Sequence, residues 1–348
     1  MTGKWKLSLA VCAAISFAIL LFAAGSGRRP RQSEAGQNIT AKTAELDSGG
    51  ALTRAADKAV VGIGRGVDHA AVVAQAIANA GGLESIVSKG DTVIIKPNLS
   101  SSRGTLTYPG NTDYRVAAEV VRQVRALGAG RIIVAEGAGT GQPLSDPIIG
   151  LIRFNSIEGV EFLDLNTVPL EDCYYLSSPK KLTGEPIYMP KIYVDAEVVI
   201  SVPKLKTNYA VGASLGLKNA FGVPPKPLVN DGSAWKLGLH SRGIPNSIVE
   251  IHLLRKPDFV VVDGIVAGEG NGPTSNDPVD ARIVLAGADV MAVDTIASYF
   301  MGFTPQKLPH LKLAAENGLG EYRMDHIQVV GADIHEIRMD FTSPFPED

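Results

Sequence analysis

Runs of apolar, mostly β-branched residues alternate with amphipathic segments along most of the chain, and this alternation constrains the fold more than any other feature. The runs at residues 92–95, 131–135 and 196–202 are dominated by apolar side chains, which is typical of strands buried on both faces. Residues 69–80 and 113–127 repeat apolar side chains at the spacing of one helix face. This order predicts an α/β fold: a mostly parallel Rossmann-like sheet with helices on both faces, in two lobes.

The rest of the folded part continues the pattern. Asp113 and Asp289 are placed to cap the helices that follow them. Residues 166–195 look like extended excursions, and the proline-containing residues 222–243 are loop-like. Further strands are expected at 60–63, 160–165, 259–262, 282–285 and 327–330, and further helices at 148–154, 212–221, 245–254, 290–301 and 308–316.

The N-terminus carries an uncharged apolar stretch at residues 7–24, between Lys4 and Lys6 on one side and arginines on the other. This length is enough to cross a bilayer as a helix, which predicts a single-pass N-terminal membrane anchor. The alternative is a signal segment that is cleaved during export, since small residues follow the stretch. Positive charges lie on both sides, so the orientation stays open.

The chain therefore divides into an anchor or signal segment and three further parts. Gly, Ser, Ala, Gln and charged residues without an apolar period predict a flexible tether. The expected boundaries are 1–27 for the first segment, 28–57 for the tether, 58–331 for the α/β domain and 332–348 for a C-terminal tail.

Composition excludes several classes of function. A formal net charge of -3 gives no global attraction to nucleic acid, so none is expected as a partner. Cys12 and Cys173 are the two cysteines, too few for an iron–sulfur cluster or a cysteine-rich zinc site within one chain. The histidines show no His-x-x-x-His spacing, so no metal site is expected. A proton-transfer role stays open for His240, whereas Cys173 is read as inert core.

Charged and amide side chains directly follow three of the predicted strands. Ligands of such sheets lie beyond the carboxyl ends of the strands, so we expect these side chains to form the site. A nearby apolar stretch adds one more lysine and one more asparagine. The candidate ligand-binding residues are Lys96, Asn98, Gly137, Gly139, Lys204, Lys206, Asn208, Lys218 and Asn219.

Lys204 and Lys206 are two residues apart, so in extended backbone they point to the same face, about 6.6 Å from each other. Two ammonium groups that close are unfavourable without an anion between them. A phosphate or carboxylate would satisfy both, with Lys218 as a third positive group. The alternative is that these lysines are solvated beside a loop. Their apolar neighbours favour the anion site.

Three carboxylates are the catalytic candidates: Glu136, Asp263 and Glu269. Each follows a predicted strand or lies in the polar segment 269–273, where a carboxylate can move a proton or hold a cation. Asn271, in the same segment, is a further ligand-binding candidate. A plain turn is the alternative reading of this segment, as it is for the glycines after residue 136.

These stretches together resemble the family known as domain of unknown function 362. The matching segments are 93–98, 196–207, 216–222, 262–265 with 269–273, and 292–294. Many members carry an added ferredoxin-like module, so the resemblance implies a possible redox partner, although this chain lacks the module. Members often have a histidine after Lys-x-Lys-Thr, where this chain has Asn208. The chain is also faintly similar to the nickel-pincer lactate racemase architecture.

The expected function is that of a membrane-tethered enzyme acting on a small anionic ligand, with lysines neutralising charge and a carboxylate moving a proton. The alternative is a non-catalytic binding or carrier module for an anionic metabolite or cofactor. The cofactor itself stays open.

Overall fold

The computed structural model describes residues 58–99, 109–138, 153–228 and 236–345. The expected anchor and tether, at residues 1–57, lie outside these ranges, as does Gly139. Within them, no helix combines the length and apolarity that a membrane crossing requires.

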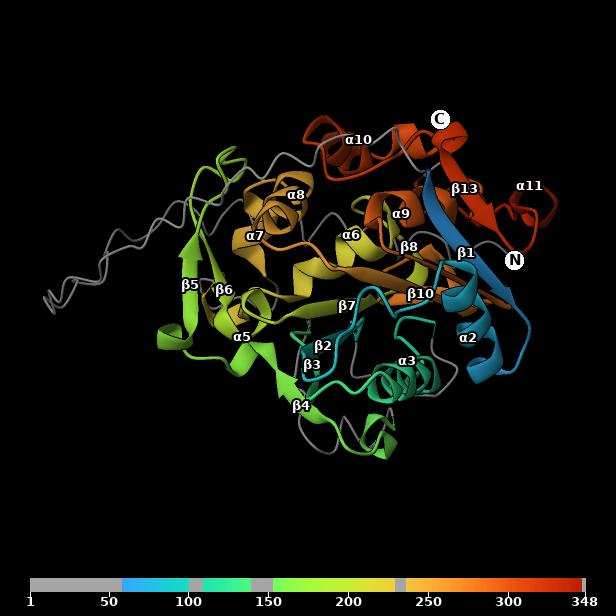
Figure 1. The fold of residues 1–348 in the computed structure, drawn as a ribbon. Helices are drawn as coiled ribbons and strands as arrows, with labels where there is room; N and C mark the ends of the chain where they lie inside the picture. Colours follow the sequence, from blue (N-terminus) through green and yellow to red (C-terminus); the bar gives the residue numbers. More distant parts are fainter. Residues whose placement is uncertain (1–57, 100–108, 139–152, 229–235, 346–348) are drawn as a thin grey trace, which may run out of the picture. The chain divides into compact units, whose positions relative to one another are not determined.

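One mixed sheet organises this part of the chain (Figure 1). Its main strands lie in the order β13 (Ile327–Val330), β1 (Ala59–Arg65), β12 (Ile283–Gly287), β10 (Phe259–Asn271), β7 (Val198–Val202), β2 (Thr92–Pro97), β3 (Arg131–Glu136) and β4 (Glu161–Asp164). Strands from β10 to β4 pair in parallel, while β12 is antiparallel to both of its neighbours. The predicted mostly parallel α/β sheet is confirmed, and the two halves of the chain share it.

Helices cover both faces, because alternate residues of each strand point to opposite sides. Val93 and Ile95 pack in one core cluster with α2 (His69–Asn79) and α3 (Tyr114–Ala126). Ile94 packs in the other, with α8, α9 and α10. Figure 1 shows α2 and α3 on one side of the sheet and the other three on the opposite side. These three helices span Ile244–Leu254, Val290–Phe300 and Pro309–Glu316.

Both predicted helix caps are present. The Asp113 carboxylate accepts a hydrogen bond from the Arg115 backbone N–H at the start of α3. Asp289 accepts from the backbone N–H groups of Met291 and Ala292 at the start of α9. Each cap satisfies N–H groups that a helix start leaves without an intrahelical partner, which fixes where the helix begins.

Three further strands extend the sheet near the end of β10, where the sequence suggested other structures. Residues 212–214 were expected in a helix but form β9 (Gly212–Ser214), which pairs with β8 (Lys204–Asn208). The helix that follows, α6, is short (Gly216–Asn219). The prediction of a loop at 269–273 is wrong for residues 269–271. These residues continue β10, which ends at Asn271 and pairs with β11 (Ser275–Val279). Pairing with a neighbouring strand overrides the propensity of the segment itself in both cases.

The remaining segments are short. The excursion at 166–195 contains the hairpin β5 (Cys173–Leu176) and β6 (Ile187–Pro190), then α5 (Lys191–Val194). The loop-like segment contains α7 (Leu237–Ser241). Most of the expected helix at 148–154 lies outside the described residues. The expected tail contains α11 (Ile334–Ile337), and Phe341 packs edge-on against Phe300 with ring centroids 6.2 Å apart. Short 3-10 turns lie at Phe154–Ser156, Leu165–Thr167, Leu170–Asp172, Ala220–Gly222, Lys226–Leu228, Pro305–Lys307 and Met324–His326.

Candidate functional site

A cavity of about 100 Å³ lies at the carboxyl ends of β2 and β3, beside β8, α6 and α7. Most of the residues predicted from the strand ends line it. These are Asn98, Glu136, Gly137, Lys206, Asn208, Lys218 and Asn219. Lys236 and His240 line it as well. The topology therefore brings side chains from five separate stretches of the chain to one cavity.

Lys96 and Glu136 form a buried ion pair at the edge of this cavity. The Lys96 Nζ lies 2.6 Å from Glu136 Oε2, and the two side chains are 1% and 3% exposed. The pair forms because β2 and β3 are adjacent and parallel, with Ile95 beside Val134. Burial lowers the pKa of Lys96, while the Glu136 charge opposes that shift. The two charges therefore compensate each other where water is scarce.

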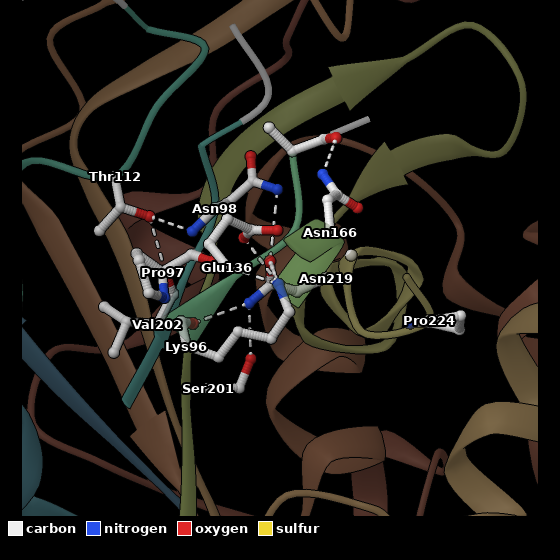
Figure 2. Close-up of polar contacts among 12 residues, drawn as sticks. Lys96, Pro97, Asn98, Thr112, Glu136, Asn166, Ser201, Val202, Asn219 and Pro224 are labelled. Atoms are coloured by element: carbon white, nitrogen blue, oxygen red, sulfur yellow. Dashed lines mark hydrogen bonds and ion pairs between the residues drawn. The ribbon is translucent and has the colours of Figure 1, made fainter. Parts of the chain in front are cut away.

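Two asparagines connect this ion pair to the cavity (Figure 2). The Asn219 Nδ2 donates to the Lys96 carbonyl at 3.0 Å and to the Ser201 hydroxyl at 2.9 Å, which fixes how its amide is turned. Its Oδ1 then accepts from Lys96 Nζ and from Asn98 Nδ2, both at 3.3 Å. The Asn98 Oδ1 is left without a donor among the described residues. A buried acceptor in that state costs about 1–3 kcal/mol.

Lys204 and Asp263 form a second buried pair that does not line the cavity. The Lys204 Nζ lies 2.8 Å from Asp263 Oδ2, with side-chain exposures of 3% and 0%. Asp263 also accepts from the backbone N–H groups of Asp113, at 2.8 Å, and Ile265, at 3.2 Å. Protein groups thus occupy both carboxylate oxygens.

Lys206 lies on the same strand as Lys204, in the extended backbone that the sequence predicted. Its Nζ donates to the carbonyls of Gly110, at 2.6 Å, and Pro273, at 3.2 Å. Burial, with the charges of Lys204 and Lys218, lowers its pKa well below the usual value. An anion shared between Lys204 and Lys206 is not required, because Lys206 donates hydrogen bonds to backbone carbonyls and Lys204 donates to Asp263.

Lys218 presents a different environment. Its side chain is half-buried, and its Nζ lies 3.6 Å from the centre of the Phe221 ring, a cation–π contact. Among the described residues, no oxygen accepts a hydrogen bond from it and no carboxylate pairs with it. Burial, with the nearby Lys96 charge, lowers its pKa to about 7. The amine is therefore about half neutral near pH 7.

Lys236 was not singled out from the sequence. Its Nζ donates to the carbonyls of Gly222, at 2.8 Å, and Pro224, at 2.7 Å, and its side chain is 1% exposed. Burial lowers its pKa to about 7, with the Glu136 charge opposing. From the sequence, a lysine within a proline-containing loop is expected to be solvated. No local pattern indicates that Lys236 is buried in the site.

His240 lines the cavity from α7 with a defined tautomer. Its Nδ1 lies 2.7 Å from the Lys236 carbonyl, which can only accept, so the proton of the neutral ring is on Nδ1. The Nε2 then carries a lone pair. Burial lowers the pKa of the ring. The ring meets Phe221 edge-on with centroids 5.0 Å apart, so His240 and Lys218 contact the same aromatic side chain.

Two glycines allow the backbone to pass close to the charged side chains of the site. A Cβ on Gly222 would overlap the Glu136 carboxylate and approach Lys96 Nζ to 2.8 Å. A Cβ on Gly137 would overlap the Gly222 carbonyl and lie 3.1 Å from Lys236 Nζ. Glycine at both positions lets the backbone approach the charged groups closely.

Asp294 does not line the cavity but holds the helix that carries two of its lining residues. Its two carboxylate oxygens accept from the backbone N–H groups of Gly216 and Leu217, both at 2.8 Å, at the start of α6. Burial raises its pKa to about 7. Asp294 thereby fixes the short helix that carries Lys218 and Asn219.

The other candidates lie elsewhere. The Glu269 carboxylate accepts from the Thr342 backbone N–H at 2.7 Å, and Asn271 is exposed; neither lines the cavity. Burial raises the pKa of the Cys173 thiol to about 11, so its thiolate is scarce. Within the described residues, no three His, Cys, Asp or Glu side chains form a group that could hold a metal ion.

Comparisons with known proteins found similar sequences and similar solved structures. A thylakoid-associated protein of Synechocystis sp. is 29% identical over 248 residues, which cover 69% of this chain and 71% of that protein. The lactate racemase apoprotein of Thermoanaerobacterium thermosaccharolyticum is 14% identical, with a TM-score of 0.45 over 65% of this chain and 53% of its own.

A crystal structure of a Thermotoga maritima protein is likewise 14% identical, with a TM-score of 0.37 over 62% of this chain and 54% of its own. This chain thus spans about half the length of both solved structures. The family described as "Domain of unknown function (DUF362)" matches residues 93–299, more than half of the sequence. The chain belongs to the DUF362 family.

Proposed function

We propose that this protein binds a small carboxylate- or phosphate-bearing ligand in the cavity between β2, β3, α6 and α7, and that it catalyses a proton transfer on that ligand. One observation carries the proposal. Lys218 and Lys236 both face the cavity, and neither forms an ion pair with a carboxylate among the described residues. Buried positive charge is costly unless an anion compensates it. A bound anion would supply that compensation.

The size of the cavity limits the ligand. An engineered cavity of about 150 Å³ accepts benzene. The present cavity, at about 100 Å³, therefore suits roughly six or fewer non-hydrogen atoms. Inorganic phosphate and two- to four-carbon carboxylates, as an approximate range, fit this limit.

Two groups in the cavity suit proton transfer near neutral pH. The His240 Nε2 carries a lone pair, since Nδ1 donates to a backbone carbonyl. The pKa of Lys218 is about 7, which is the range in which a side chain both accepts and releases protons efficiently. These two groups favour catalysis over simple binding.

A carrier without catalytic activity is the second candidate, and the carboxylates favour it. Both Glu136 and Asp263 are occupied by lysine partners, so neither has an open charge to act as a base. A carrier would hold the anion through donors alone.

Calorimetric titration of the full-length protein with phosphate, pyruvate and lactate tests the site. Replacing Lys218 or Lys236 by Met should weaken binding roughly tenfold to hundredfold, the effect of losing a charge-assisted contact. The matched control is Lys312→Met, on the exposed face of α10. Unchanged affinity in both cavity variants would remove the site assignment.

Catalysis and carriage are separated by hydrogen exchange. An enzyme of the proposed kind should exchange a carbon-bound proton of pyruvate or lactate with deuterium from D2O, seen by NMR. His240→Gln should slow this exchange about a hundredfold or more while binding is retained. Tight binding with no exchange would identify a carrier.

Membrane attachment through residues 7–24 is part of the proposal. The apolar stretch and the thylakoid association of the Synechocystis relative support it. A single-pass anchor should keep the full-length protein in membranes after carbonate washing, with the stretch still present by mass spectrometry. Release together with loss of the N-terminal segment would point instead to export after signal cleavage.

A further inference from the structure

Lys218 differs from the other buried lysines around the cavity in what its amine contacts. Lys96 donates to Glu136, and Lys236 donates to two backbone carbonyls. Among the described residues, the Lys218 Nζ instead faces the ring of Phe221 at 3.6 Å. Since no oxygen of these residues accepts a hydrogen bond from the amine, the nitrogen can lose a proton, and its lone pair is then available for reaction.

The surroundings of Lys218 favour that neutral amine. Burial disfavours the ammonium form of Lys218, and Lys96 adds a like charge nearby; together they lower its pKa to about 7, although the Glu136 charge opposes the shift. A lysine that is desolvated or placed beside another cation is a nucleophile toward carbonyl groups. The half-buried side chain also lies where a ligand in the cavity reaches it.

We propose that the Lys218 amine forms an imine with a small oxo acid, a ligand that combines a carbonyl group with a carboxylate. The proposal rests on the proposed function, because the carboxylate is the anion that the cavity would hold. Lys236 lies in the same cavity and uses two of its three N–H groups on backbone carbonyls. The third has no acceptor in the part of the chain that the structure describes, and we expect it to donate to the carboxylate of the ligand.

The reaction needs no oxidant or reductant. The Nζ lone pair forms a bond to the carbonyl carbon, while the C=O π electrons move to oxygen, which takes up a proton. The nitrogen then loses a proton, which gives a carbinolamine. The hydroxyl takes up a second proton and leaves as water while the nitrogen lone pair forms the C=N bond, and loss of the second nitrogen proton leaves the neutral imine. Amine and carbonyl compound thus become imine and water.

His240 is placed to move the protons of this reaction. Its ring contacts the same Phe221 side chain as Lys218, with centroids 5.0 Å apart, and its Nε2 carries a lone pair. It can take the proton that the attacking nitrogen loses and return it to the departing hydroxyl.

Reductive trapping tests the inference. Full-length protein is incubated with pyruvate and cyanoborohydride, and the adduct is located by peptide mass spectrometry. The adduct should form at Lys218 at least about tenfold faster than at exposed Lys312. Acetone, a carbonyl compound without a carboxylate, should label Lys218 far more slowly.

The variant Lys218→Arg separates this inference from the proposed function. Arginine keeps the positive charge but is not a nucleophile, so phosphate binding should persist while the adduct disappears. Pyruvate binding without an adduct at Lys218, or labelling spread evenly over surface lysines, would overturn the imine and leave the anion site standing. Absence of both phosphate binding and adduct would overturn both proposals.

Discussion

Two buried lysine–carboxylate pairs lie in the same sheet, and they differ in how completely the protein satisfies them. Lys96–Glu136 and Lys204–Asp263 have similar separations, 2.6 and 2.8 Å, and all four side chains are almost fully buried. Asp263 accepts two further backbone hydrogen bonds and lies away from the cavity. Glu136 borders the cavity, with Lys218 and Lys236 nearby.

We infer from this difference that the same kind of ion pair has two roles in the protein. A buried ion pair is favourable only when hydrogen bonds complete it, because desolvation otherwise exceeds the attraction. The Lys204–Asp263 pair is complete and also holds the start of α3 through the Asp113 backbone. The Lys96–Glu136 pair lies beside Lys218 and Lys236, which pair with no carboxylate of the described residues. We therefore expect the first pair to contribute mainly to stability, and we propose ligand binding for the second.

Removal of Asp263 should produce the largest loss of stability. Asp263→Ala leaves Lys204 buried without its partner and removes an acceptor of the Asp113 N–H, so we expect a loss of about 3–5 kcal/mol in the free energy of unfolding. Urea unfolding measures it. Glu161→Ala, which breaks an exposed pair with Arg131, is the matched control and should have little effect. Equal losses in the two variants would break the comparison.

Acid sensitivity should arise from a third kind of buried group, histidines that form no ion pair with a carboxylate of the described residues. His310 and His252 are fully buried on α10 and α8, and burial lowers their pKa values to about 3 and about 4. Both stay neutral in the folded protein and gain a proton on unfolding below about pH 6.5.

Stability should therefore be complete above about pH 6.5 and fall as the pH drops toward 4, by about 1 kcal/mol per pH unit for each histidine. Urea unfolding between pH 7 and 4, as an approximate range, measures the slope. His310→Leu should flatten it, whereas replacement of exposed His335 should not. An unchanged slope in His310→Leu would assign the acid sensitivity to carboxylates instead.

Neutralising Glu136 should have a smaller effect on stability but a distinctive one on binding. Glu136→Gln keeps the shape of the side chain and removes the carboxylate that pairs with Lys96, so we expect a loss of about 1–3 kcal/mol in unfolding free energy. Removal of this negative charge from the edge of the cavity should raise phosphate affinity severalfold, measured by calorimetry. A fall in affinity would show that Glu136 positions the ligand rather than balancing Lys96.

The sequence predicted the parts of the fold that depend on local patterns. The apolar run at 92–95 and the cap at Asp113 define a strand and a helix without reference to the rest of the chain. The convergence of Lys96 and Glu136 was also predictable, since adjacent parallel strands bring their carboxyl ends together. Features that local pattern and sheet topology determine together could therefore be predicted from the sequence.

The rest depends on tertiary contacts and strand pairing that the pattern of a single segment does not reveal. Lys236 becomes part of the site through the carbonyls of Gly222 and Pro224, which no spacing in the sequence reveals. Glu269 reads as part of a glycine-rich loop, yet pairing with β11 makes it a strand residue away from the cavity. The position of a residue at the end of an apolar run did not indicate whether protein or ligand would satisfy its charge.

Carbon-13 NMR of labelled lysine side chains in the full-length protein tests whether Lys218 and Lys236 together hold an anion, with the Lys218→Arg and Lys236→Met variants to assign signals. We predict that both lysines titrate near pH 7 and that phosphate moves both titrations to higher pH, because an anion stabilises the ammonium form. Titration of both near the ordinary lysine pKa of 10.5, with no response to phosphate, would contradict this prediction.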